Sequence, residues 1–185
     1  MNKVEPTGLR KVPQATDLYL QQLRQAVGPR VPLAFVNGCF DIFHAGHERC
    51  LRQAGVFGMP VVVAINSDEY LRRTKRRPFA QSVEERAARI MALPFVRDVV
   101  VFDDDTPERL IDRLRPSLVV KGPDYAGVTL PEGRTIGRVG ATLLICDDKK
   151  LVSSTELAMR RENAQEMQHA ATAGLAPGKQ ARLGQ

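Results

Sequence analysis

His44 and His47 lie three residues apart, in a run from Gly38 to His47 that follows an apolar segment at 31–36. The apolar segment is typical of a buried strand and the residues from about Ala45 onward of a helix, so the pair marks a strand-to-helix turn. Positions i and i+3 in the first turn share one face of a helix. Two imidazoles beside free N–H groups and the positive end of a helix dipole make a site for an oxyanion such as phosphate. Gly46, between them, would let a ligand approach the backbone closely.

Histidine pairs also occur as structural residues and as metal ligands. A zinc site normally needs three or four ligands, and the remaining histidine, His169, lies far along the chain in a polar segment. We therefore interpret the pair as phosphate-binding. Cys39 follows the predicted strand and has no obvious base near it in the sequence, so we interpret it as structural.

Composition indicates a soluble globular protein of one domain, with 185 residues, 43% of them apolar and 26% charged. No run approaches the roughly 18 apolar residues that span a bilayer. The segment 1–12 is polar and basic without an apolar stretch, so we expect it not to act as a secretory signal. Three cysteines without a Cys-x-x-Cys spacing indicate reduced thiols, and we expect a cytoplasmic protein without a membrane partner.

The positive charge is concentrated in five cations within residues 72–77, in a chain of formal net charge +6. A nucleic-acid surface more often spreads its cations over a face and mixes them with stacking residues. Here only Tyr70 and Phe79 flank the run. We interpret the run as a solvated loop and expect no nucleic-acid partner.

Short apolar runs alternate with amphipathic stretches along the chain. The predicted strands are 33–36, 61–65, 99–102, 118–120 and 142–145, and the predicted helices between them are 48–57, 83–93, 107–114 and 135–139. The strands are too continuously apolar for a sheet with one wet face, which indicates a parallel sheet covered on both sides. The expected fold is a doubly wound α/β domain, which binds ligands at the carboxyl ends of its strands.

Three polar segments follow predicted strands and should meet at that edge of the sheet. They are the histidine turn, Asn66 to Asp68, and Lys121 to Tyr125. The acidic segment 103–108 resembles a metal cluster, but we interpret it as a helix start with Thr106 as N-cap and Pro107 at the first helical position.

The expected organisation is an N-terminal extension at 1–29 with a helix at 16–27, then a single domain at 30–161. The segment 162–185 is rich in Gln, Ala and Gly, and we expect it to contain the end of a last helix and a disordered tail.

The segment from Asn37 to His47 resembles the signature of the cytidylyltransferase-like nucleotidyltransferases, in which His-x-Gly-His follows Phe-Asp at the end of the first strand. A second family element, Ile-Ser-Thr-Thr or Ile-Ser-Ser-Thr at the start of the last helix, is matched by Val-Ser-Ser-Thr at 152–155. The resemblance covers about residues 31–160 and implies a Rossmann-like nucleotidyltransferase fold.

Within the superfamily the chain is similar to the adenylyltransferases that act on D-glycero-β-D-manno-heptose 1-phosphate. The matching segments are 63–68, the basic segment ending at Pro78, 84–86, 103–107 and 119–125. The chain departs from that pattern at Pro123, where the family usually has glycine, in its shorter and more cationic basic segment, and at 149–151. Two alternatives stay open: a glycerol-3-phosphate cytidylyltransferase that uses CTP, and a nucleotide-binding module without turnover.

The implied reaction is attack by an acceptor phosphate on the α-phosphorus of ATP or CTP, with release of pyrophosphate. The acceptor is a sugar or polyol phosphate, already ionised at pH 7, so no general base is needed. The resemblance alone suggests a homodimer.

The resemblance also implies roles for individual residues. His44 and His47 are expected on the α- and β-phosphates, with Lys75 as a mobile cation over them. Nucleotide-binding residues are expected to be Asn37, Gly38, Phe40, Asp41, Gly46, Asn66, Lys121, Asp124, Ser153, Ser154 and Thr155. Arg77 and Tyr125 are expected to contact the acceptor. The expected cofactor is Mg²⁺, held by phosphate oxygens and water with no protein side chain as metal ligand.

Overall fold

A computed structural model describes residues 11–75 and 78–146, which fall in the first of the two units (1–152 and 153–185) into which the chain divides. Five parallel strands form one sheet in the order β3-β2-β1-β4-β5. They are β1 (Ala34–Gly38), β2 (Val61–Asn66), β3 (Val96–Phe102), β4 (Leu118–Lys121) and β5 (Thr142–Ile145). All five predicted strands are present, with ends shifted by at most three residues.

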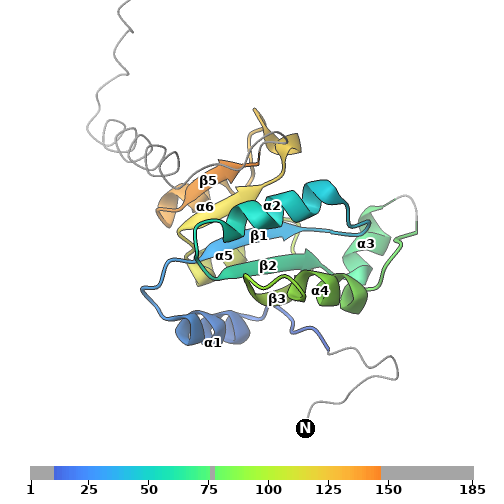
Figure 1. Cartoon of the computed structure of the whole chain (residues 1–185), viewed down its shortest axis with the longest axis horizontal. Helices are drawn as coiled ribbons and strands as arrows, with labels where there is room; N and C mark the ends of the chain where they lie inside the picture. The colour runs from blue at the N-terminus through green and yellow to red at the C-terminus, as the bar shows by residue number, and fades with distance from the viewer. Residues whose placement is uncertain (1–10, 76–77, 147–185) are drawn as a thin grey trace, which may run out of the picture. The chain divides into compact units, whose positions relative to one another are not determined.

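Helices cover both faces of the sheet (Figure 1). They are α1 (Asp17–Val27), α2 (Ala45–Gly55), α3 (Asp68–Thr74), α4 (Val83–Met91), α5 (Glu108–Leu114), the 3₁₀ helix η1 (Pro123–Tyr125) and α6 (Gly133–Arg138). α2 and α4 pack on one face, whereas α1, α5 and α6 share the core of the other face. The predicted doubly wound α/β fold is thus confirmed.

The N-terminal extension is part of this fold. Leu20 and Leu23 of α1 lie in the same buried cluster as Val100 of β3. Just before α1, the backbone pairs with the outer edge of β3, where Ala15 N–H donates to the Val101 carbonyl at 2.7 Å. An edge strand with unpaired N–H and C=O groups is prone to pair with other chains, and this segment covers part of that edge.

Two local predictions about helices are wrong. The cationic run at 72–77 was expected as a loop, but Arg72 and Arg73 belong to α3, which begins after the N-cap Ser67. Only Leu71 of this seven-residue helix is buried, so its sequence carries almost no apolar period.

The second correction concerns the start of α5. The hydroxyl of Thr106 donates to the Glu108 carboxylate at 3.2 Å instead of capping a backbone N–H. Pro107 occupies the N-cap position and the helix begins at Glu108, one residue later than expected.

The strand order places a switch point between β1 and β4. The chain runs from β1 outward through β2 to β3, then returns to the other side of β1 for β4 and β5. Ligands of doubly wound sheets bind at the carboxyl ends of the strands, in the crevice at such a point. β1 and β4 are in register from Ala34 opposite Leu118, so their carboxyl ends lie together.

Candidate active site

The two histidines occupy the N-terminus of α2, at the carboxyl end of β1. Their rings stack with centroids 3.8 Å apart and an interplanar angle of 23°. His44 is the N-cap: its Nδ1 accepts a hydrogen bond of 3.1 Å from the Gly46 N–H. The prediction that the pair shares one face at a strand-to-helix turn is confirmed.

Gly46 is needed for this arrangement for a reason beyond ligand access. A Cβ at position 46 would lie 3.0 Å from both Cε1 and Nδ1 of His44. That distance is tighter than ordinary packing, so the His44 ring would have to shift by a few tenths of an ångström to admit a side chain at position 46.

His47 is enclosed by aromatic rings. The Phe40 ring centroid lies 5.0 Å from that of His47, and the Phe43 centroid 5.9 Å. Burial lowers the pKa of His47 below its ordinary value, and the His44 charge lowers it further. The Ile42 backbone, by hydrogen bonding, opposes the shift. A neutral imidazole can donate one hydrogen bond to a phosphate without carrying a formal charge.

Charged groups from two other elements act on His47. Lys75, the C-cap of α3, lowers its pKa and Asp124 of η1 raises it. Charged side chains from the segments that follow β2 and β4 are therefore close enough to the histidine turn after β1 to shift the pKa of His47. This convergence matches the geometry expected from the sequence.

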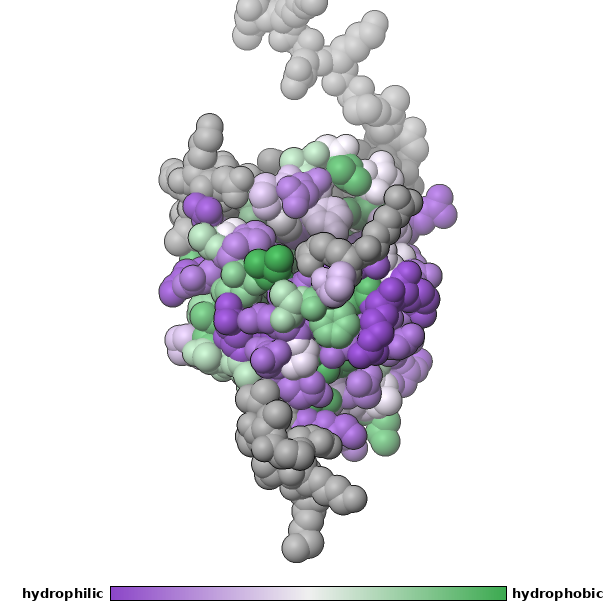
Figure 2. Space-filling view, turned by 90° about the vertical axis from the view of Figure 1, so that its right-hand side faces the viewer, coloured by the Kyte–Doolittle hydropathy of each residue, from purple (hydrophilic) through white to green (hydrophobic). Residues whose placement is uncertain are grey.

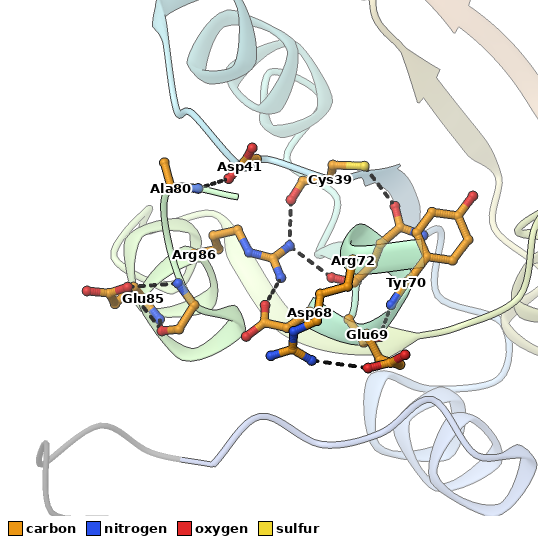
Figure 3. A network of polar contacts seen from close by, with 12 residues as sticks. Cys39, Asp41, Asp68, Glu69, Tyr70, Arg72, Ala80, Glu85 and Arg86 are labelled. Atoms are coloured by element: carbon orange, nitrogen blue, oxygen red, sulfur yellow. Dashed lines mark hydrogen bonds and ion pairs between the residues drawn. The ribbon is translucent and has the colours of Figure 1, made fainter. Parts of the chain in front are cut away.

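Asp41 anchors the segment after α3 to the histidine turn. Its carboxylate accepts a hydrogen bond of 2.9 Å from Lys75 Nζ and one of 2.6 Å from the Ala80 N–H, the latter visible in Figure 3. Asp41 is 2% exposed, so its charge is almost wholly removed from water and depends on these donors. Lys75 is already beside the histidine turn, held by Asp41.

Lys121, at the end of β4, is buried in a network of its own. Its Nζ donates to Asn37 Oδ1 at 2.8 Å, forms an ion pair with Glu132 and lies 5.1 Å from the ring centroid of Tyr125. Both Lys121 and Glu132 have about 3% of their surface exposed. The network joins β1, β4 and the loop after β4 at the switch point.

The three cysteines are free thiols in packed surroundings. Cys39 donates to Asn66 Oδ1 at 3.3 Å, and burial raises the pKa of its thiol. The pKa of the Cys50 thiol is also raised, first by a hydrogen bond with Cys146 and then by burial. A thiol kept protonated is a poor nucleophile, which supports the interpretation of Cys39 as structural.

Figure 2 looks onto the carboxyl edge of the sheet, where hydrophilic residues surround smaller apolar areas. Among the exposed apolar side chains, Ile42, Tyr125 and Val128 come from the loops that follow β1 and β4. Apolar side chains beside imidazole and ammonium groups suit a ligand that has an anionic part and an apolar or planar part.

Comparison with known proteins identifies the family. The model of the family described as cytidylyltransferase-like matches residues 35–160. The chain belongs to this family. The match starts within β1 and includes the histidine turn, so the cytidylyltransferase-like signature occupies the site built above.

Two curated relatives share about half of the aligned residues. The D-beta-D-heptose 1-phosphate adenylyltransferase of Bordetella bronchiseptica is 51% identical over 104 residues, which are 55% of this chain and 64% of that protein. The bifunctional protein HldE of Campylobacter curvus is 50% identical over 97 residues, which are 51% of this chain and 20% of that protein. The chain thus spans less than two thirds of the first relative and about a fifth of the second.

Among solved structures, a protein of unknown function from Archaeoglobus fulgidus has the same fold. The TM-score is 0.50 at 20% sequence identity, over 66% of this chain and 96% of that one.

Most of the residues expected for the cytidylyltransferase-like site lie in the loops and strand ends at this edge. Asn37 and Gly38 end β1, Asn66 ends β2, and Asp124 and Tyr125 form part of η1. Phe40 is buried against His47, so its observed contact is internal to the protein. Arg77, Ser153, Ser154 and Thr155 lie outside the described residues.

Sequence reasoning did not predict the burial of two charged residues beside the site, Glu132 and Arg86. Glu132 has no sequence signal, because its pairing with Lys121 arises only in the folded chain. Arg86 does have a sequence signal. It shares a buried stripe of α4 with Ile90, four residues later, at a position where an apolar side chain is expected.

Proposed function

We propose that this protein is a nucleotidyltransferase that joins ATP and D-glycero-β-D-manno-heptose 1-phosphate into ADP-heptose and releases pyrophosphate. The observation that carries the proposal is the stacked pair of His44 and His47 at the N-terminus of α2, beside the β1–β4 switch point. Membership of the cytidylyltransferase-like family supports the reaction class. The heptose 1-phosphate adenylyltransferase among the relatives supports the acceptor.

The chemistry requires alignment and charge stabilisation, and little else. A phosphate oxygen of the acceptor attacks the α-phosphorus, the bond between the α-phosphorus and the α,β-bridging oxygen breaks, and pyrophosphate leaves with the electron pair of that bond. The acceptor is ionised at neutral pH, so no residue has to remove a proton. Preorganised donors aimed at the developing charge then supply most of the catalysis.

His44 and His47 are the proposed donors to the α- and β-phosphates. Their location at a helix N-terminus adds the N–H groups and dipole that favour an anion. Lys75 is the proposed cation over the phosphates: it would exchange its ion pair with Asp41 for one with the triphosphate. Lys121 contacts Asn37 and Tyr125 at the carboxyl ends of β1 and β4 and is proposed to hold both in place for the ligand.

Mg²⁺ is proposed to enter with the triphosphate, where it would neutralise phosphate charge. The buried carboxylate nearest the histidines in sequence, Asp41, has both oxygens engaged by Lys75 and the Ala80 N–H. This donor set fits a magnesium ion held by phosphate oxygens and water, which is a common arrangement for that ion.

The test is pyrophosphate release in the presence of Mg²⁺, with ATP and CTP each combined with heptose 1-phosphate and glycerol 3-phosphate. Release with ATP and heptose 1-phosphate alone is the expected result. Release with CTP and glycerol 3-phosphate instead would replace the proposed substrates and keep the reaction class. No release in any combination, from a folded protein that binds neither triphosphate, would contradict the proposal.

A further inference from the structure

Arg86 is a fully buried arginine behind the histidine turn, 1% exposed, on the inner face of α4. Figure 3 shows its guanidinium between the ends of two strands and α3. One nitrogen donates to the backbone carbonyl of Cys39 at 2.6 Å and to that of Asn66 at 2.8 Å. The other donates to the Asp68 carboxylate at 2.6 Å. Arg86 therefore joins the ends of β1 and β2 to the first turn of α3.

A contribution to stability does not by itself explain why an arginine is buried at this position. Removing a guanidinium from water costs several kcal/mol, and a buried ion pair repays the cost only with excellent geometry. Within the described part of the chain, Arg86 Nε has no hydrogen-bond partner. The neighbouring buried residues of α4, Ala87 and Ile90, are apolar. The apolar stripe of α4 therefore does not account for an arginine at position 86.

The carbonyl that Arg86 holds lies next to a strained residue. Phe40, directly after Cys39, has φ of +50°, a left-handed conformation that is rare for a bulky side chain. Such a conformation is strained and persists only where the surroundings fix it. Arg86 fixes the peptide group before Phe40, while Lys75 and the Ala80 N–H fix the Asp41 carboxylate after it.

The strained residue in turn supports His47. The Phe40 ring lies 5.0 Å from the His47 ring, centroid to centroid. Phe40 also packs against Gly38, where a Cβ would come within 3.2 Å of its ring, so there is little room for the ring to move. If Phe40 relaxed to an ordinary backbone conformation, its ring would leave this position and His47 would lose one of the aromatic rings that pack against it.

We propose that Arg86 is a positioning residue, which holds the Cys39 carbonyl so that Phe40 keeps its left-handed turn and seats the His47 imidazole. The effect on turnover rests on the nucleotidyltransferase function proposed above. The effect on His47 itself does not, because the imidazole can be observed without substrate.

The test uses Arg86→Lys in the full chain, which keeps the positive charge but cannot bridge three acceptors in a plane. Turnover and the triphosphate KM are measured together with the NMR titration of His47, assigned by the loss of its signals in His47→Gln. We expect kcat to fall by about 10²-fold, the loss typical of a misplacement near 1 Å. We expect a much smaller change in KM, and a His47 pKa that moves back toward its ordinary value as the ring gains access to water.

Two further variants separate positioning from stability. Ile90→Val, on the same buried face of α4, removes one buried methyl group and should lower the melting temperature while leaving both kcat and the His47 titration unchanged. Asp68→Asn weakens one anchor of Arg86 without touching the buried carbonyls. It should shift the His47 signals in the same direction as Arg86→Lys, and it decides the question should Arg86→Lys fail to fold.

An unchanged His47 titration in a folded Arg86→Lys or Asp68→Asn protein would overturn the proposal. So would a loss of turnover that Ile90→Val reproduces. Absence of transferase activity in the unaltered protein would contradict the proposed function only, since the titration still tests whether Arg86 seats His47.

Discussion

The imidazole of His47 lies directly against that of His44, 3.8 Å from centroid to centroid. Two imidazolium ions in such contact would repel each other, and burial disfavours a charge on His47. Burial and the contact with His44 thus both favour the neutral form of His47. Neutral or singly charged donors can stabilise charge that develops on the leaving pyrophosphate without binding the ground-state triphosphate as tightly as two cations would.

The lowered pKa of His47 predicts a pH-dependent stability. Histidine in the unfolded chain titrates near 6.5, and the folded protein binds that proton only at lower pH. The unfolded state therefore binds more protons as the pH falls below about 6.5, so the free energy of unfolding falls through that window until the folded pKa is reached. Above the unfolded pKa this contribution is fully present. Urea unfolding between pH 5.5 and 7.5 measures it.

His47→Gln provides the comparison, because glutamine does not titrate in this range. Its free energy of unfolding should change less between pH 5.5 and 7.5 than that of the unaltered protein. Equal slopes for the two proteins would show that His47 keeps its ordinary pKa in the folded state.

His44 is predicted to serve both the helix and the reaction, and two substitutions separate these roles. His44→Ala removes the cap on the Gly46 N–H, which costs about 1 kcal/mol, and lowers turnover by about 10²–10³. Asparagine is a good N-cap, so His44→Asn should recover the melting temperature and not the turnover. Pyrophosphate release and thermal unfolding of both variants test this. Near-normal turnover in His44→Asn would remove His44 from the reaction.

Lys75→Ala is predicted to raise the triphosphate KM and slow the chemical step, because the site loses the cation that Asp41 holds beside the histidines. Arg72→Ala is the matched control: this cation lies three residues earlier, points to solvent with 59% of its side chain exposed, and pairs with Glu69. Steady-state kinetics with varied ATP should leave Arg72→Ala close to the unaltered protein. If Arg77→Ala alone raised the KM, the role would belong to Arg77.

The sequence predicted what depends on local pattern. Continuous apolar runs predicted all five strands, and the end of each strand in a parallel sheet determines which loops share an edge. For this reason the sequence alone places the histidine turn and the segment starting at Lys121 at the same edge of the sheet. The helix α3 was not predicted because Leu71 is its only buried residue, and a single apolar position shows no helical period in the sequence.

What the sequence could not predict depends on contacts between distant segments. Glu132 follows Lys121 by eleven residues, and nothing in the intervening loop indicates that their side chains meet. The position of Arg86 on the apolar stripe of α4 indicates burial, but its three acceptors, 18 to 47 residues away in the chain, are apparent only in the folded protein. Pairings of this kind are determined by the tertiary fold. A single sequence shows each charged residue but not the residue with which it pairs.

The buried pair of Lys121 and Glu132 gives a prediction in which stability and function separate. Glu132→Leu alone leaves an ammonium buried without its counter-charge and should cost about 3–5 kcal/mol of stability. Lys121→Met combined with Glu132→Leu removes both charges and fills the space, so chemical denaturation should show most of that loss recovered. Triphosphate affinity should stay low in the double variant, because Asn37 loses the donor to its Oδ1 and Tyr125 loses the cation over its ring.

The exposed pair of Arg138 and Asp112 is the control for that experiment. Its side chains are 62% and 39% exposed, and Arg138→Ala should change stability by less than about 1 kcal/mol with no effect on nucleotide binding. If the double variant recovered both stability and triphosphate affinity, the buried pair would be a structural element only. If it recovered stability and not affinity, the ammonium of Lys121 would be retained at the switch point because it orients Asn37 and Tyr125 for the ligand.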